Sequence, residues 1–361
     1  MKTISVLLVL FIVCSLFSSS PITSFNYLLK FGIPFFFYII GYNLISSKEL
    51  FNYFISKIWL FFGYFTIYIV IVNVFGIGEG IYSGGLKAGY YSLNGLYVPT
   101  FSTLFFIFFY RRIQTRKERI LGLLFAIATI TILVLLLKRT LILLVAIGLV
   151  FYLFKTISVK RIFQTIVLGV IFVLIGFYFR EQLTESFDAR SSRFSGEYNV
   201  AEEGRFTEII FLFDYMSNKP TSLIFGTGEV FNDRETVSRI YGVDREAHNS
   251  YIRIFWSAGF VGLAIFLLLY FQQFKMARKG YRYFKAQADF ELSHLFFFVT
   301  LFICMRFLND FSSGITYLSY NAFSLIIIGG SFQILKNSFV GNTPLSTTAN
   351  EARHIDKSTN L

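Results

Sequence analysis

The stretch HNSYIRIFWSAGFVG, from His248 to Gly262, joins a polar cluster directly to an apolar helix, with no turn between them. His248 is therefore expected where water meets the bilayer, at the mouth of a transmembrane helix. An imidazole changes its charge near neutral pH, so it can hold a polar substrate and move a proton. The stretch predicts a membrane protein with a titratable site at one face of the bilayer.

The composition of the chain supports the membrane class. Of its 361 residues, 55% are apolar, 20% are aromatic and only 15% are charged, less charge than a soluble protein carries. The mean hydropathy is +0.61. Apolar runs of about 17–25 residues can each cross a bilayer, and we predict about ten such helices in an all-α protein. The predicted spans are roughly 3–18, 31–47, 54–76, 95–110, 120–137, 140–155, 162–179, 250–272, 294–309 and 317–335.

The first span has two interpretations, a signal peptide or a retained helix. We expect a retained helix, because Ser18-Ser19-Ser20-Pro21 offers no clear small-x-small cleavage site. Three short basic loops, near 111–119, 155–161 and 275–285, are expected in the cytoplasm. Ten crossings with the N-terminus inside put all three basic loops on the cytoplasmic side. They also place residues 77–94 and 180–247 outside.

The outer loop 180–247 differs in charge from the rest of the chain. It holds eight Lys and Arg against thirteen Asp and Glu, a net charge of −5, whereas the remainder carries +17. The basic excess is therefore attributed to membrane topology and not to binding of nucleic acid. We predict one polytopic membrane domain, residues 1–336, with this loop inserted, followed by a disordered cytoplasmic tail, residues 337–361.

Loop 180–247 is too long to be a simple connection. Apolar residues between 206 and 216 lie on one face of a predicted helix, which opens at Gly204 and ends before Pro220. A short apolar run and a glycine turn follow at residues 223–228. The helix is expected along the outer membrane surface or across the bundle.

His248 is the only histidine at the predicted outer face, since His294 lies at the cytoplasmic end of a span and His354 lies in the tail. Two interpretations stay open for it. It can be an ordinary interfacial histidine with one hydrogen bond, or it can be a general base.

Four further polar residues are candidate substrate ligands. Arg139 lies in a short outer turn, against the usual charge bias, and can bind phosphate oxygens or extend to the interface. Arg205, at the start of the loop helix, is a second phosphate contact or a solvated side chain. Asn249 and Arg253 share one face of the helix after His248, and the alternative for Arg253 is an ion pair with an acid of the outer loop.

Several site types are absent from the sequence. There is no GxxxxGK[ST] phosphate loop, no HExxH motif and no CxxC pair. Cys14 and Cys304 both lie in predicted helices, so no disulfide is expected in the outer loops. The sequence therefore predicts no cofactor and no metal, and chemistry carried by a base and guanidinium groups.

Three segments, in this order, resemble the bacterial O-antigen ligase and polymerase family. They are Lys138-Arg139-Thr140; Gly204-Arg205-Phe206 with Pro220 and Phe225-Gly226-Thr227-Gly228; and Ala247-His248-Asn249-Ser250-Tyr251 with Gly259-Phe260-Val261-Gly262. The resemblance covers about residues 120–270. Lys138 departs from the pattern, because the family often has Ser there.

The resemblance implies a metal-independent glycosyltransferase of the C-type architecture, which acts at the outer face of the bacterial inner membrane. It implies a polyprenyl-diphosphate-linked glycan as donor and a glycan or the lipid A core as acceptor. A chain-length regulator is a further possible partner. In this scheme His248 is the catalytic base, and Arg139, Arg205, Asn249 and Arg253 bind substrate.

Three functions compete at this point. The first is polymerisation of lipid-linked repeat units into surface polysaccharide, and the second is the ligase reaction onto lipid A core. The third is a flippase or transporter for lipid-linked sugars, which is expected to line a central cavity with charges deep in its helices. Here the polar candidates gather at one face, which favours surface chemistry. A purely structural scaffold is a further alternative.

Overall fold

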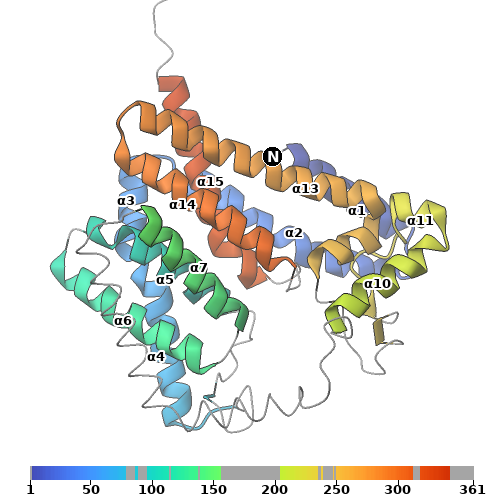
Figure 1. Cartoon of the computed structure of the whole chain (residues 1–361), viewed down its shortest axis with the longest axis horizontal. Coiled ribbons are helices and arrows are strands. Elements are labelled where there is room, and N and C mark those ends of the chain that lie inside the picture. Colours follow the sequence, from blue (N-terminus) through green and yellow to red (C-terminus); the bar gives the residue numbers. More distant parts are fainter. Residues whose placement is uncertain are drawn as a thin grey trace, which may run out of the picture.

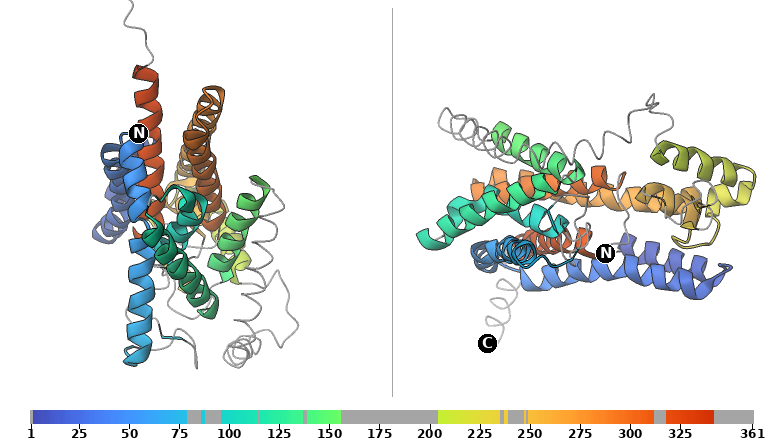
Figure 2. Two further views of the ribbon diagram at one scale, coloured as in Figure 1. Left: turned by 90° about the vertical axis from the view of Figure 1, so that its left-hand side faces the viewer. Right: turned by 90° about the horizontal axis from the view of Figure 1, so that it is seen from below.

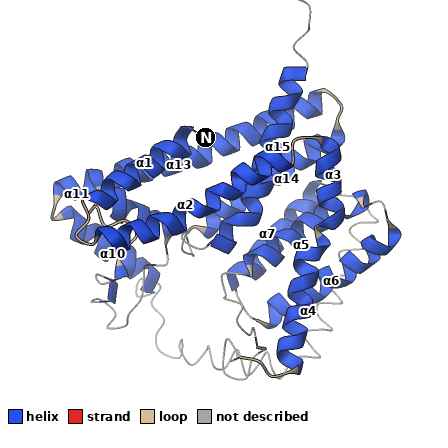
Figure 3. Cartoon of the chain, turned by 180° about the vertical axis from the view of Figure 1, so that it is seen from behind, coloured by secondary structure: helices blue, strands red, loops and turns tan. Residues whose placement is uncertain are grey.

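The computed structural model describes residues 2–78, 86–87, 96–113, 115–136, 139–155, 204–234, 237–238, 247, 249–311 and 318–341. Within these ranges every regular element is a helix, as the predicted all-α class requires, and Figure 3 draws no strand among them. The predicted span 162–179 and the predicted tail beyond Gly341 lie outside the described residues.

The helices follow one another along the chain as labelled in Figure 1. They are α1 (Lys2–Leu16), α2 (Pro21–Leu44), α3 (Lys48–Lys57), α4 (Trp59–Val74), α5 (Tyr97–Phe109), the 3-10 turn η1 (Tyr110–Arg112), α6 (Arg116–Leu135), α7 (Arg139–Lys155), α10 (Gly204–Ser217), α11 (Pro220–Phe225), α13 (Ser250–Ala286), α14 (Phe290–Asn309) and α15 (Leu318–Gly341).

Six helical segments of the described chain are long and apolar enough to cross a membrane. They are Pro21–Leu44, Lys48–Val74, Arg116–Leu135, Ser250–Ala286, Phe290–Asn309 and Ala322–Phe339. Lys2–Leu16 and Leu141–Phe151 are shorter apolar helices. The described part of this membrane protein is thus all-helical and has six candidate spans, and the count of about ten helices stays a prediction.

For two predicted spans, the helices in the structure have different bounds or lengths from those predicted. The predicted span 54–76 begins inside α3, which starts where Ser47 Oγ accepts the N–H of Leu50 and ends at Lys57, and it continues as α4. The two helices together form the candidate span Lys48–Val74. The span 95–110 is only 13 residues long as α5, but almost every one of its side chains is buried. It packs against α4, α6, α7 and α15, so α5 is an interior helix of the bundle.

The predicted loop helix is confirmed as α10, which ends at Ser217, and Pro220 begins the short helix α11. α10 and α11 lie beside the first turns of α13, next to the end of α1 (Figures 1 and 2). This end of the bundle therefore collects the motif segments after residue 204.

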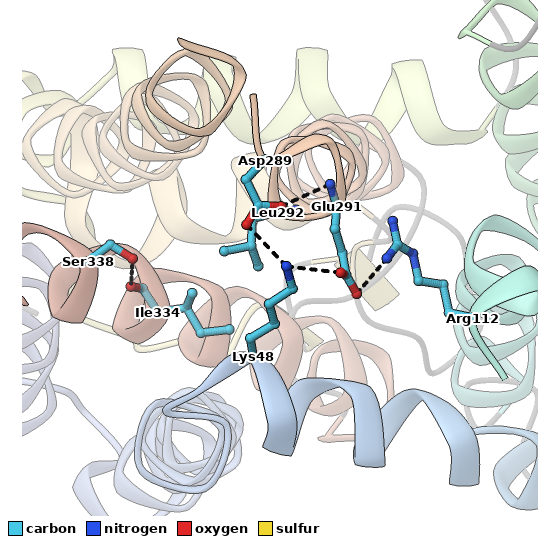
Figure 4. Close-up of polar contacts among 7 residues, drawn as sticks. All are labelled: Lys48, Arg112, Asp289, Glu291, Leu292, Ile334 and Ser338. Atoms are coloured by element: carbon cyan, nitrogen blue, oxygen red, sulfur yellow. Dashed lines mark hydrogen bonds and ion pairs between the residues drawn. The ribbon is translucent and has the colours of Figure 1, made fainter. Parts of the chain in front are cut away.

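Ion pairs tie several elements together just beyond the other end of α13 (Figure 4). Lys48 Nζ lies 3.2 Å from an oxygen of Asp289 and 3.0 Å from an oxygen of Glu291, and Arg112 Nη1 lies 2.7 Å from the second oxygen of Glu291. Partial burial raises the pKa of Asp289, but the N–H of Leu292 and the ammonium of Lys48 outweigh it and hold the pKa below its usual value. The network joins the start of α3, the turn η1 and the start of α14.

Candidate functional site

Helix α13 is broken at Ala258 and Gly259. The backbone of Gly259 has φ 60° and ψ −159°, a region that is essentially open only to glycine. Residues 250–257 therefore form a short first part, whose direction is independent of the long second part, 260–286. The predicted start at residue 250 agrees with the structure, but the helix continues past the predicted end at 272 to Ala286, through the predicted basic loop 275–285. The sequence prediction also did not include this break.

The glycine turn at residues 226–228 caps the first part of α13. Thr227 donates both its N–H (2.8 Å) and its Oγ1–H (3.0 Å) to the carbonyl of Trp256, and the N–H of Gly228 donates to the carbonyl of Ser257 (3.3 Å). A helix end leaves its last carbonyls without helical partners, and this turn supplies donors for them. Two of the three motif segments thus meet at the break.

The glycines of the two segments are required by close backbone contact. A Cβ on Gly226 would lie 2.4 Å from the nitrogen of Ala258, and a Cβ on Gly259 would lie 2.3 Å from the carbonyl oxygen of Ile224. Real Cβ atoms do not approach backbone this closely, so neither position accepts a side chain without a shift of the backbone. These motif glycines have a structural role: they set the direction of the turns that follow His248.

Asn249 is the N-cap of α13. Its side-chain oxygen accepts the N–H groups of Tyr251 (2.9 Å) and Ile252 (3.1 Å), and the residue is buried. Next to it, the N–H of Ser250 donates to the carbonyl of Asp310 at 2.9 Å, at the end of α14. The backbone directly after His248 is therefore fixed. A substrate contact by Asn249 stays a prediction.

Arg253 forms the ion pair that was its alternative interpretation. Its Nε lies 3.0 Å from Oδ1 of Asp233, and its Nη2 donates to the carbonyl of Phe231 at 2.5 Å. The guanidinium carbon lies 5.7 Å from the ring centre of Tyr27 and 5.6 Å from that of Phe231. Arg253 is 1% exposed and Asp233 is fully buried. Direct contact with substrate stays a prediction for Arg253.

Asp233 and Glu229 were not singled out by the sequence. Glu229 accepts Ser18 Oγ–H and the N–H of Ser19, both at 2.6 Å, and so joins the glycine turn to the α1–α2 junction. Burial raises the pKa of Glu229, but these hydrogen bonds outweigh it and lower the pKa below its usual value, so the carboxylate is ionised at neutral pH. Nothing in the sequence distinguishes either residue from the other acids of loop 180–247.

The helix that carries Arg205 packs on the first part of α13. The rings of Phe213 and Phe255 lie 5.9 Å apart, and those of Tyr215 and Trp256 lie 5.4 Å apart. Figure 1 shows α10 alongside this part of α13. The motif Gly204-Arg205-Phe206 is the first turn of α10, so its helix belongs to the same end of the bundle.

Three of the predicted site residues cannot be placed as side chains. His248 lies outside the described residues, although Ala247 and Asn249 on either side of it are described. Arg139 and Arg205 are placed in α7 and α10 as backbone only. The convergence of these three side chains at one site stays a prediction.

Residues 123–267 match the family model described as O-antigen ligase. The matched range begins in α6 and ends in the second part of α13, so it contains all three motif segments and the break. No curated protein matches the chain at a significant level. The family match, together with the order of the three segments, supports an assignment to the O-antigen ligase and polymerase family that rests on residues 123–267.

Proposed function

We propose that the protein polymerises polyprenyl-diphosphate-linked oligosaccharide repeat units into a surface polysaccharide, at the outer face of the bacterial inner membrane. The match of residues 123–267 to the O-antigen ligase family model supports glycan transfer of this type. The observation that carries the proposal is that the two residues next to His248 are both held by hydrogen bonds, at the end of the bundle where two family segments meet. The N–H of Ala247 donates to Asp233, and the side chain of Asn249 accepts the N–H of Tyr251.

The chemistry needs a base and a stabilised leaving group. His248, when neutral, takes the proton of the acceptor sugar hydroxyl, and the oxygen attacks the anomeric carbon of the donor glycan. The bond to the diphosphate oxygen breaks, and the negative charge moves to the polyprenyl diphosphate. Arg139 and Arg205 are proposed to hold this charge, because a guanidinium binds phosphate oxygens in a planar, two-donor contact.

A ligase is the second candidate, and it is favoured by the description of the matched family model. The ligase would use the same donor and the same base but the lipid A core as acceptor. A flippase is a weaker alternative, since nothing described at the break in α13 requires movement of a glycan across the bilayer.

Product analysis separates these functions. The purified protein in liposomes receives the lipid-linked oligosaccharide that accumulates in cells lacking it, with or without lipid A core. We expect a ladder of products without lipid A core, as polymerisation requires. A single transfer that depends on lipid A core would favour the ligase, and translocation without a new glycosidic bond would contradict both enzymes.

Arg139→Lys and Arg205→Lys are each expected to lower the transfer rate by about tenfold or more, because the planar contact is lost while the charge is kept. The measurement is the initial rate in the same liposome assay. Arg116→Lys, at the first residue of α6 in the basic segment 111–119, is the matched control and should keep the wild-type rate. Full activity of both Arg139→Lys and Arg205→Lys at normal protein levels would remove the two-donor contact from the proposal.

A further inference from the structure

Asp233 makes contacts on both sides of His248 in the sequence. Its Oδ2 accepts the N–H of Ala247 at 2.6 Å, and its Oδ1 accepts Nε–H of Arg253 at 3.0 Å. Ala247 directly precedes His248, and Arg253 is in the first part of α13. A single carboxylate thus spans the segment that carries the proposed base.

The three residues in these contacts are buried. Burying charged and polar groups costs free energy unless each of them has a hydrogen-bond or ion-pair partner. Asp233 is fully buried, Arg253 is 1% exposed and Ala247 is 3% exposed. Removing an ion pair from water costs several kcal/mol per ion, so a buried pair is poor evidence for stability alone. Such pairs can instead define one arrangement among several.

Asp233 is itself fixed to the body of the protein. Its carbonyl accepts the N–H of Val237 at 2.9 Å, and two residues earlier the N–H of Phe231 donates to Oγ of Ser257 at 2.7 Å. Ser257 lies at the end of the first part of α13, beside the break. The backbone next to Asp233 is therefore tied to α13 by a contact that does not involve Ala247.

We propose that Asp233 is a positioning residue, which acts through Ala247 and Arg253 to hold the backbone of His248 in place for catalysis. The inference rests on the proposed function, because positioning of His248 matters only if His248 is the catalytic base. Asp233 does not contact substrate, since it has no exposed surface. Without its bond to Ala247, the backbone before His248 loses a described buried hydrogen bond, and we expect the base to occupy its productive position for less of the time.

Asp233→Asn tests the role. The two donors bond to different oxygens of the carboxylate, and in asparagine one of these oxygens is replaced by an NH₂ group, which cannot accept. Either Ala247 N–H or Arg253 Nε–H therefore faces a second donor and loses its bond. We expect kcat to fall about 10- to 100-fold, as for a small displacement of a catalytic group. KM for the lipid-linked oligosaccharide should stay within about twofold, because Asp233 does not bind it. Hydrogen exchange of a peptide containing Ala247 should become faster.

Glu229→Gln is the matched control. Glu229 anchors the same loop but touches Ser18 and Ser19 and not Ala247. The control is expected to lower the melting temperature without a fall in the kcat of folded protein. If Asp233→Asn only lowers the folded fraction, as Glu229→Gln does, or keeps the wild-type kcat and exchange, the positioning role is overturned.

His248→Ala is measured in the same preparation, so that two kinds of failure can be distinguished. Full activity of His248→Ala would overturn the proposed function. Hydrogen exchange at Ala247 would still show whether the bond between Asp233 and Ala247 holds the backbone there. Loss of activity in His248→Ala with full activity in Asp233→Asn would overturn the positioning role alone.

Discussion

Replacing His248 with alanine is expected to lower the rate of glycan transfer by roughly 10²–10⁴-fold, the usual contribution of a general base. The variant should still insert and accumulate, because the contacts that fix its neighbours belong to Asp233 and Asn249 and not to the imidazole. In cells, long surface polysaccharide should disappear from a gel. The liposome assay measures the fall in rate directly.

His294→Gln is the matched control at the other end of the bundle. The ring of His294 lies against Phe108 and Phe109, with Nε2 3.3 Å from the carbonyl oxygen of Phe108, so its described contacts are structural. It should keep near wild-type activity. His248→Gln distinguishes the two roles of His248: partial activity indicates a hydrogen-bond donor to the diphosphate. Polysaccharide of wild-type length and amount in His248→Ala would leave His248 an ordinary interfacial residue.

The sequence predicted the membrane class and the order of the motifs because both depend on local pattern. Apolar runs long enough to span a bilayer are visible residue by residue. The helix α10 was visible for the same reason, since its apolar residues repeat with helical spacing and Pro220 follows its end. The break at Gly259 left only a weak signal, a glycine inside an apolar helix, which costs about 1 kcal/mol relative to alanine.

The residues that hold the site could not be predicted, because their partners are set by the tertiary fold. Asp233 is one of thirteen acids in loop 180–247, and no spacing distinguishes it from the others. Its significance appears only when Arg253 and Ala247 lie against it. Glu229 is similar, because its hydrogen bonds go to Ser18 and Ser19, about 210 residues earlier in the chain.

Gly259→Ala is expected to destabilise the protein by about 3 kcal/mol or more. A residue with a Cβ costs of order 1–3 kcal/mol in this backbone conformation. The Cβ would also lie 2.3 Å from the carbonyl oxygen of Ile224 and 2.6 Å from the nitrogen of Gly226, both of them backbone atoms. The glycine turn must then move away, and the hydrogen bonds that it gives to Trp256 and Ser257, worth about 1 kcal/mol each, weaken.

The fluorescence of Trp256 can be used to measure this change. The chain has two Trp residues, and Trp256 is the one whose carbonyl is capped by the turn. In a Trp59→Phe background, fluorescence therefore follows the break during thermal unfolding in detergent. Gly32→Ala is the matched control: its Cβ would meet only Leu8 Cδ2 at an ordinary 3.6 Å, and alanine favours the helix by up to about 1 kcal/mol. Its melting temperature should equal or exceed that of the parent, whereas an unchanged melting temperature in Gly259→Ala would show that the break tolerates a side chain and that the turn does not depend on glycine.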